Sequence, residues 1–191
     1  MKSFLTLIDE YVNINPSSTS KFKHLVQTKS LEKGEILQIQ GEKNGSVYFV
    51  KSGMLRSYTI DKKGKEHIFM FAPENWIMGD GTHSDSPNAL HIDVLEKSEV
   101  EIISQKEFEI TFMPLTNKSN EDTTTSMLKR ITVLQQRIIM LMSASAIERY
   151  EHFTETYPHI SQRVPQKMIA SYLGITPEAL SKVKGEKVRG K

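Results

Sequence analysis

The sequence predicts an α+β protein: an N-terminal antiparallel β-roll of the jelly-roll type, a long dimerisation helix and a C-terminal helix-turn-helix domain. Short β-prone runs alternate with glycine-containing turns between about residues 30 and 103, which is typical of an antiparallel barrel or jelly roll. A long amphipathic stretch follows over 121–142, and residues 166–184 fit a helix-turn-helix. The predicted domains are the roll over 1–116, the central helix over 117–142 and the C-terminal domain over 143–191.

Two short helices are expected before the roll. Residues 4–12 place five apolar side chains at helical spacing. The Asn-Pro-Ser-Ser sequence at 15–18 ends that helix, and residues 18–26 predict a second one.

The roll is predicted from its β-prone runs and from the turns between them. A Ser-x-x-Glu sequence at 104–107 has the form of a capping box, so a short helix is expected after the last strand. The expected strands lie at 36–39, 47–50, 55–60, 67–71, 92–95 and 100–103, separated by turn signals such as Gly41, Gly53 and Lys63-Gly64.

The central helix carries one apolar stripe with residues three or four apart. Its members are Met127, Ile131, Leu134, Ile138 and Leu141. Burying this stripe against the same helix of a second copy explains its length and its heptad-like spacing, which predicts a homodimer. Core packing within one chain is the alternative.

The C-terminal motif has the required residue type at each position. Ala170 stands where two helices must touch, and Gly174 supplies a turn residue that tolerates positive φ. Thr176 is the expected N-cap of the second helix, Pro177 its first residue, and Glu178 lies in the first turn, where the helix dipole favours a carboxylate. The residues expected to lock the helices together are Ile169, Leu173, Ile175, Leu180 and Val183.

Basic residues gather at the same end of the chain. Residues 161–191 hold seven Lys and Arg against two Glu, which favours a polyanionic partner, double-stranded DNA. The alternatives to DNA binding are a solvated basic tail and a helical hairpin used only for packing. In a DNA complex the second helix lies in the major groove. The expected contacts are Pro177, Glu178, Ser181 and Lys182 near its start, with Lys184 and Lys167 holding the backbone.

The order of these parts resembles the Crp/Fnr family of bacterial transcription regulators, whose roll is a cyclic-nucleotide-binding-like domain. The resemblance implies a cytoplasmic regulator, a homodimer on double-stranded DNA, and RNA polymerase as a candidate further partner. Glu148-Arg149-Tyr150 with Val164-Pro165 looks most like the branch common in Bacteroidetes. The resemblance is carried by residues 31–37, 41–42, 47–53, 71–80 and the C-terminal motif.

Family members that bind cyclic AMP have a Gly-Glu pair followed by an Arg-Ser or Arg-Thr pair. This chain has Gly79-Asp80, then Asn88-Ala89 at the second place, and no arginine between 79 and 95. Because a buried cyclic phosphate needs a paired cation, we expect no tight cyclic AMP binding, and the effector remains unknown. The candidate effector pocket comprises Gly79, Asp80, Ser84, Asn88, Ala89, Arg56 and Arg130.

The sequence also argues against several other classes. With no cysteine, disulfides, thiolate nucleophiles, iron–sulfur clusters and Cys-bound zinc or haem are excluded. His83, Asp85, His91 and Asp93 suggest a metal, but the His-x-His of a cupin enzyme is absent and the loop is Ser/Asn-rich. No phosphate loop or nucleophile elbow occurs. We therefore expect no enzyme, metal or cofactor.

Membrane association is not expected either, because the chain has no signal peptide and no apolar run long enough to span a bilayer. The main alternative function is a ligand-binding sensor module without specific DNA binding. It draws support from the tail, which has no wing hairpin after the second helix and is expected to break at Gly185.

Overall fold

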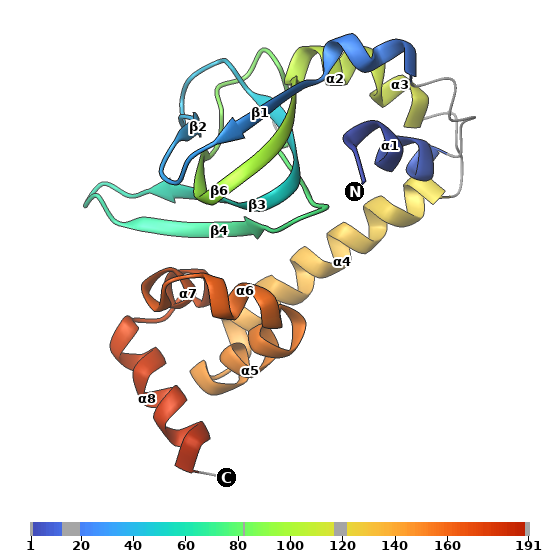
Figure 1. Cartoon of the computed structure of the whole chain (residues 1–191). Helices are drawn as coiled ribbons and strands as arrows, with labels where there is room; N and C mark the ends of the chain where they lie inside the picture. Colours follow the sequence, from blue (N-terminus) through green and yellow to red (C-terminus); the bar gives the residue numbers. More distant parts are fainter. Residues whose placement is uncertain (1, 13–19, 82, 117–121, 190–191) are drawn as a thin grey trace. The chain divides into compact units, whose positions relative to one another are not determined.

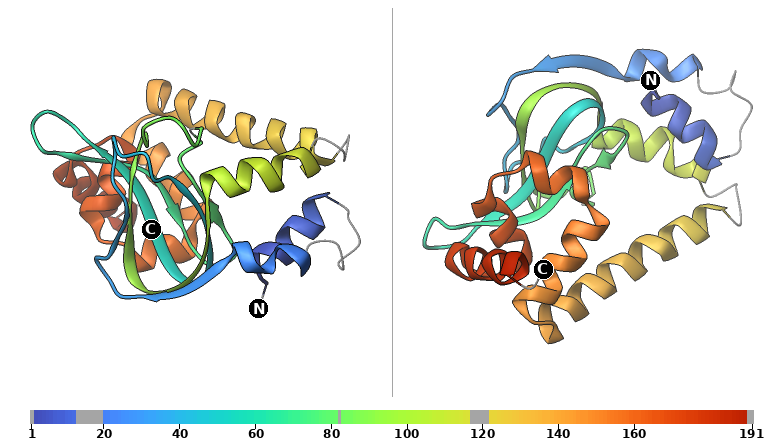
Figure 2. Two further views of the ribbon diagram at one scale, coloured as in Figure 1. Left: turned by 90° about the horizontal axis from the view of Figure 1, so that it is seen from above. Right: turned by 60° about the horizontal axis from the view of Figure 1, so that its bottom comes forward.

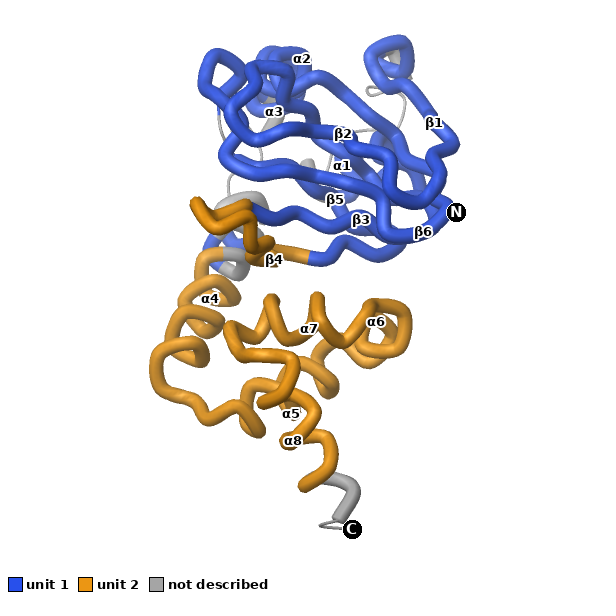
Figure 3. The backbone as a smooth tube through the Cα atoms, turned by 90° about the vertical axis from the view of Figure 1, so that its left-hand side faces the viewer, with its two compact units in different colours: residues 1–59, 71–128 blue, residues 60–70, 129–191 orange. Residues whose placement is uncertain are grey.

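The computed structural model divides the chain into two compact units (Figure 3). Unit 1 comprises residues 1–59 and 71–128, and unit 2 comprises residues 60–70 and 129–191. The tip of one β-hairpin therefore belongs to the same unit as the C-terminal helices. The domain boundaries given above stay predictions. The structure describes residues 2–12, 20–81, 83–116 and 122–189.

Unit 1 is built on a six-stranded sheet with the strand order β1–β6–β3–β4, in which β2 also pairs with β6 and β5 with β3 (Figure 1). The last strand returns beside the first, with Gln27 opposite Ile102 and Leu31 opposite Ser98 in antiparallel register. The predicted antiparallel roll is confirmed. The strands are β1 (Gln27–Leu31), β2 (Ile36–Gln38), β3 (Ser46–Ile60), β4 (Glu66–Ala72), β5 (Ile77–Met78) and β6 (His91–Ser104).

The prediction of a turn at Gly53 is wrong, because the two expected runs around it form one strand, β3. Gly53 has a φ of 88°, and the register between β3 and β6 shifts on both sides of it. A Cβ on Gly53 would lie 2.1 Å from the hydroxyl of Ser98. The glycine therefore marks a bulge that bends a continuous strand and lets β6 approach closely.

Strand β1 was not predicted, and its composition explains why. Its first four residues, Gln27 to Ser30, are all exposed, and only Leu31 is buried. An edge strand of polar residues lacks the alternation by which strands are recognised in sequence.

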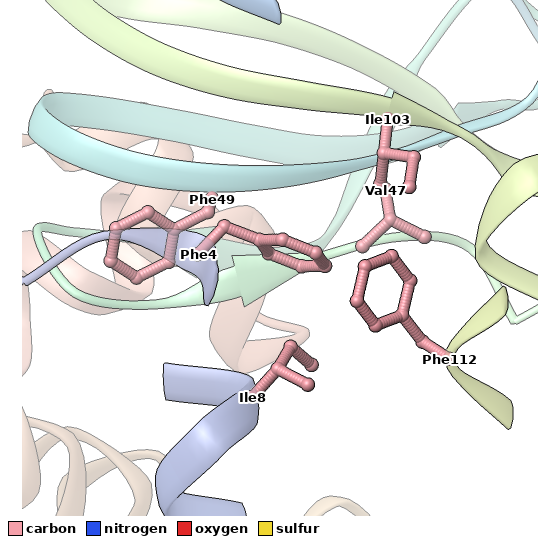
Figure 4. Close-up of a cluster of buried hydrophobic side chains, with 6 residues drawn as sticks. All are labelled: Phe4, Ile8, Val47, Phe49, Ile103 and Phe112. Carbon is pink, nitrogen blue, oxygen red and sulfur yellow. The ribbon is translucent and has the colours of Figure 1, made fainter. Parts of the chain in front are cut away.

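A hydrophobic cluster fills the end of the roll where the first helix packs (Figure 4). The rings of Phe4 and Phe112 meet edge to face with centroids 5.5 Å apart. The Phe4 N–H also donates to the Glu101 carboxylate at 2.6 Å. The cluster consists of Phe4, Ile8, Val47, Phe49, Ile103 and Phe112. It holds the first helix on the roll.

The predicted helices around the roll are confirmed where the structure describes them. Ser104 caps α2, its hydroxyl accepting the Glu107 N–H. The expected second helix is a 3₁₀ turn, and its first two residues, 18 and 19, lie outside the described residues. The helices of this region are α1 (Phe4–Val12), η1 (Ser20–Leu25), α2 (Gln105–Thr111) and α3 (Met113–Thr116).

Helices α5 to α8 form one group (Figure 2), in which α5 packs against α6, α7 and α8. Ser145 starts α5 with a capping box, and its hydroxyl and N–H hold the pKa of Glu148 below its usual range. Helix α5 ends at its C-cap Tyr157, and Pro158 begins the short helix α6, which the sequence analysis does not predict. No helix in the described ranges is long and apolar enough to cross a bilayer. These helices are α4 (Asp122–Ser143), α5 (Ala146–Thr156), α6 (Pro158–Arg163), α7 (Gln166–Leu173) and α8 (Pro177–Arg189).

Candidate DNA-binding surface and effector pocket

Helices α7 and α8 form the predicted helix-turn-helix, and Gly174 makes its turn. Gly174 has φ 67° and ψ 30°, in the left-handed region. The Ile175 N–H donates to the Ala170 carbonyl at 3.0 Å, and the Gly174 N–H to the Ser171 carbonyl at 3.1 Å. This pair of bonds is a Schellman motif, which satisfies the last carbonyls of α7 and fixes the direction of the chain into α8.

The apolar lock between the two helices is in place. Ile175 is half-buried, and the other locking residues are buried. The buried members are Ile169, Leu173, Leu180 and Val183, together with Ala170, which has no exposed surface. The small Ala170 side chain thus lies at the close contact predicted for it.

Helix α8 begins as the sequence predicts. The Thr176 hydroxyl accepts the Ala179 N–H at 3.2 Å, and Pro177 is the first helical residue. The Glu178 carboxylate accepts its own N–H and the Thr176 hydroxyl, and these bonds lower its pKa. Because Glu178 stays ionised there, it matches the positive end of the helix dipole.

The candidate DNA contacts lie on the exposed side of this motif. Pro177, Glu178, Ser181 and Lys182 are all exposed, and their spacing places them on one face of α8. The Ser181 hydroxyl donates to the Pro177 carbonyl at 3.0 Å, and Lys182 lies 3.9 Å from Glu186.

The two expected backbone contacts differ in exposure. Lys167 is exposed on α7, and Lys184 is half-buried on α8. The expected break at Gly185 is wrong, because α8 continues through it to Arg189. A helix tolerates a single glycine at a modest cost.

Arg149 connects three backbone carbonyls, and the sequence points to this residue only through the family resemblance. Its guanidinium donates to the carbonyls of Leu141 at 2.9 Å, Ala144 at 3.0 Å and Leu173 at 3.1 Å. These carbonyls lie at or just beyond the C-terminal ends of α4 and α7, where backbone acceptors have no helical partner. Arg149 therefore ties the two helix ends together.

In the roll, the Asp80 carboxylate is held by the protein's own donors. One oxygen accepts the Gln38 side-chain N–H at 3.0 Å and the Ala89 backbone N–H at 2.8 Å. Asn88 donates to the Ile39 carbonyl and to the Asn44 side chain. The structure thus brings Asp80, Asn88 and Ala89 together, and Gln38, which the sequence analysis missed, completes the group.

Among the described residues, the side-chain oxygens of Gln38 and Asn88 have no hydrogen-bond partner. Gln38 is 1% exposed and Asn88 is 2% exposed. The polar groups gathered here are therefore the half-buried Asp80 carboxylate and two buried amides, and the amide atoms without a partner are hydrogen-bond acceptors.

The other pocket candidates have different partners. Arg56 forms a bidentate pair with Asp93, at 2.7 and 2.8 Å, and lies 4.2 Å from the centre of the Tyr58 ring. Ser84 bonds through its N–H and hydroxyl to Glu109 of α2, and with Gln105 it lowers the pKa of that carboxyl. Gly79 precedes Asp80 after strand β5. The Arg130 side chain lies outside the described residues.

Comparison with known proteins gives matches to both parts of the chain. The cyclic nucleotide-binding domain family matches residues 28–113. The regulatory protein HlyX of Actinobacillus pleuropneumoniae is 28% identical over 174 residues, covering 82% of this chain and 70% of HlyX. The fumarate and nitrate reduction regulatory protein of Vibrio cholerae is 26% identical over 190 residues, covering 90% and 73%. The chain is therefore similar, over most of its length, to regulators of the Crp/Fnr type.

Solved structures of Crp/Fnr proteins share the fold. FixK2 from Bradyrhizobium japonicum has a TM-score of 0.73 at 18% identity, covering 86% of each chain. The c-di-GMP responsive regulator CLP of Xanthomonas campestris has a TM-score of 0.70 at 14% identity, covering 92% and 93%. The matched relatives are regulatory proteins and not enzymes, in agreement with the expectation from the sequence.

Proposed function

We propose that the protein is a cytoplasmic, homodimeric transcription regulator that binds double-stranded DNA with helix α8 of each protomer. The complete helix-turn-helix carries the proposal: its turn is ordered, its lock is buried and the outer face of α8 is free. Such a helix enters the major groove, and two copies meet half-sites about 34 Å apart on a near-palindromic operator. RNA polymerase is the expected further partner of the bound regulator.

The exposed side of α4 supports the homodimer. Ile131, Leu134, Ile138 and Leu141 repeat with alternating spacings of three and four and are 38–57% exposed. Leaving such a stripe in water is unfavourable, and a second α4 covers it with knobs-into-holes packing. Dimerisation also places two basic recognition helices on one duplex, so loss of the α4–α4 contact should weaken DNA binding.

Substitution of Lys182 tests the DNA-binding face. Lys182→Ala removes an exposed cation from α8. We expect binding to an operator duplex to weaken about fivefold and the salt dependence of log K to become shallower by about one unit, because one phosphate contact is lost. Fluorescence anisotropy across a salt series measures both quantities.

Lys29→Ala is the matched control, because Lys29 is exposed on β1 in unit 1. The operator affinity of Lys29→Ala and the salt dependence of its log K should equal those of the wild type. A flat salt profile for the wild type itself would instead support the sensor module without specific DNA binding.

The environment of Asp80 supports a pocket that does not take cyclic AMP. The two donors on the Asp80 oxygen are already used, and the nearby orphan atoms are acceptors. Arg56, the arginine of the candidate pocket whose side chain is described, is paired with Asp93. A phosphate placed beside these oxygens would be repelled and left without a counter-ion, which costs about 3–5 kcal/mol in a buried site.

Isothermal titration with cyclic AMP tests this part of the proposal. We expect no binding heat at micromolar ligand, since a loss of about 3–5 kcal/mol weakens affinity by roughly two to four orders of magnitude. Adenosine, which lacks the phosphate, is the matched control ligand. Micromolar binding of cyclic AMP together with no binding of adenosine would show that the pocket recognises the phosphate and would contradict the proposal.

A further inference from the structure

The tip of the β3–β4 hairpin, residues 60–70, is part of unit 2 (Figure 3). At its turn the Asp61 carboxylate accepts the N–H groups of Lys63 and Lys65 and bonds to His67. These bonds, first of all the one to His67, lower the pKa of Asp61 to about 2. The turn is therefore held by an ionised carboxylate throughout the neutral pH range.

Helix α7 attaches to this hairpin through Ser171. The Ser171 hydroxyl accepts the Ile68 N–H at 3.0 Å and donates to the Glu66 carbonyl at 2.9 Å. Strand β4 ends the main strand order of the sheet, so its outer side has free backbone groups. The Ser171 hydroxyl thus makes hydrogen bonds to β4 of the kind that a neighbouring strand would make.

Arg137 of α4 joins the same two elements. Its guanidinium donates to the carbonyls of Phe69 and Ile68 on the hairpin and to the Tyr172 carbonyl at the end of α7. It lies 4.1 Å from the centre of the Tyr172 ring and 5.5 Å from that of Phe69. Burial lowers the pKa of Arg137, and among the described residues its guanidinium contacts carbonyl oxygens and ring faces rather than a carboxylate.

Those contacts suit arginine in particular. A planar fork serves several carbonyls and stacks on aromatic rings at once, whereas a lysine ammonium is a single point donor. The cation also lies at the C-terminal end of α7, where the helix dipole favours positive charge. Burying a guanidinium with no carboxylate beside it is unfavourable unless its N–H groups are otherwise hydrogen-bonded. Here those bonds require α4, α7 and the 60–70 hairpin to stay in contact.

We propose that Arg137 is a positioning residue for DNA binding: together with Ser171 it clamps helix α7 to the 60–70 hairpin and so preorganises the recognition helix α8. The inference rests on the proposed function. The clamp needs no contact between Arg137 and DNA. Because β3 and β4 continue into the sheet of unit 1, the hairpin is a covalent extension of the roll within the DNA-binding unit.

Arg137→Gln tests the clamp through DNA binding. We expect at least a tenfold loss of operator affinity with the salt slope of the wild type, because positioning is lost and no phosphate contact is removed. Arg137→Lys should recover little, and Ser171→Ala, which keeps a good helix former, should lower affinity in the same direction. The matched control is Lys62→Gln, which removes one exposed positive charge from the hairpin turn and should bind as the wild type does.

Hydrogen exchange provides a readout that does not depend on DNA. In Arg137→Gln the amides of residues 66–70 and of α7 should exchange at least tenfold faster, while the amides of β1 and β6 keep their wild-type rates. Operator affinity equal to or above that of the wild type, a shallower salt slope, or unchanged exchange would each overturn the clamp. A wild-type protein that binds no duplex would refute the proposed function, and the exchange rates would still decide whether the clamp exists.

Discussion

Gly174→Val should reduce operator affinity by about 100-fold or more. A β-branched residue at the Gly174 φ of 67° is strained, at a cost of about 1–3 kcal/mol. Its Cβ would also lie 3.2 Å from Leu141 Cδ2 and 3.6 Å from Arg149 Nη1, which adds about 1–3 kcal/mol of overpacking. A combined loss near 3 kcal/mol corresponds to about 100-fold in affinity.

Gly185→Val, within helix α8, is the matched control. Gly185 is helical, has an ordinary φ, and nothing lies within 4 Å of an added Cβ. Anisotropy with both variants, accompanied by thermal melts, separates loss of the turn from a general effect of valine. Wild-type affinity of Gly174→Val would mean that the turn does not orient the DNA-reading helix.

Ile138→Glu should convert the dimer to monomers and lower operator affinity by about 100-fold, as Gly174→Val does. Ile138 is 57% exposed in the single chain and lies at the centre of the apolar stripe of α4. In a dimer, two carboxylates would face each other in an apolar seam, and burying them unpaired costs several kcal/mol. Sedimentation equilibrium measures the assembly, and anisotropy measures the binding.

Gln136→Glu introduces the same charge at an exposed position of α4, two residues away and on the other side of the heptad pattern. This control should remain dimeric and bind DNA normally. If Ile138→Glu sediments as the wild type does, α4 is not the seam, and the stripe must be covered in another way.

Features encoded within a few consecutive residues were predicted well. Gly174, the Thr176 cap and the capping residue Ser104 each act on neighbours one to five positions away. Their chemistry is local, so the residue type alone indicates the structure. The same reasoning failed at Gly53, because a positive φ serves a bulge as well as a turn, and only the strand opposite decides between them.

Features that depend on distant residues could not be predicted. Gln38 meets Asp80 across 42 positions, Arg137 meets Phe69 across 68, and Ser171 meets Ile68 across 103. None of these residues has an unusual neighbourhood in the sequence. Arg56 had been expected to line the pocket, and its pairing with Asp93 follows from the register of β3 on β6, which the sequence does not reveal.

In the proposed complex, a dimer of this chain reads a specific DNA sequence with two α8 helices. The most direct test is selection from a random duplex library by the purified wild-type protein with no ligand added. We expect enrichment of a two-fold symmetric site whose half-sites lie about one helical turn apart. Failure of the folded, dimeric protein to enrich any sequence would contradict this proposal.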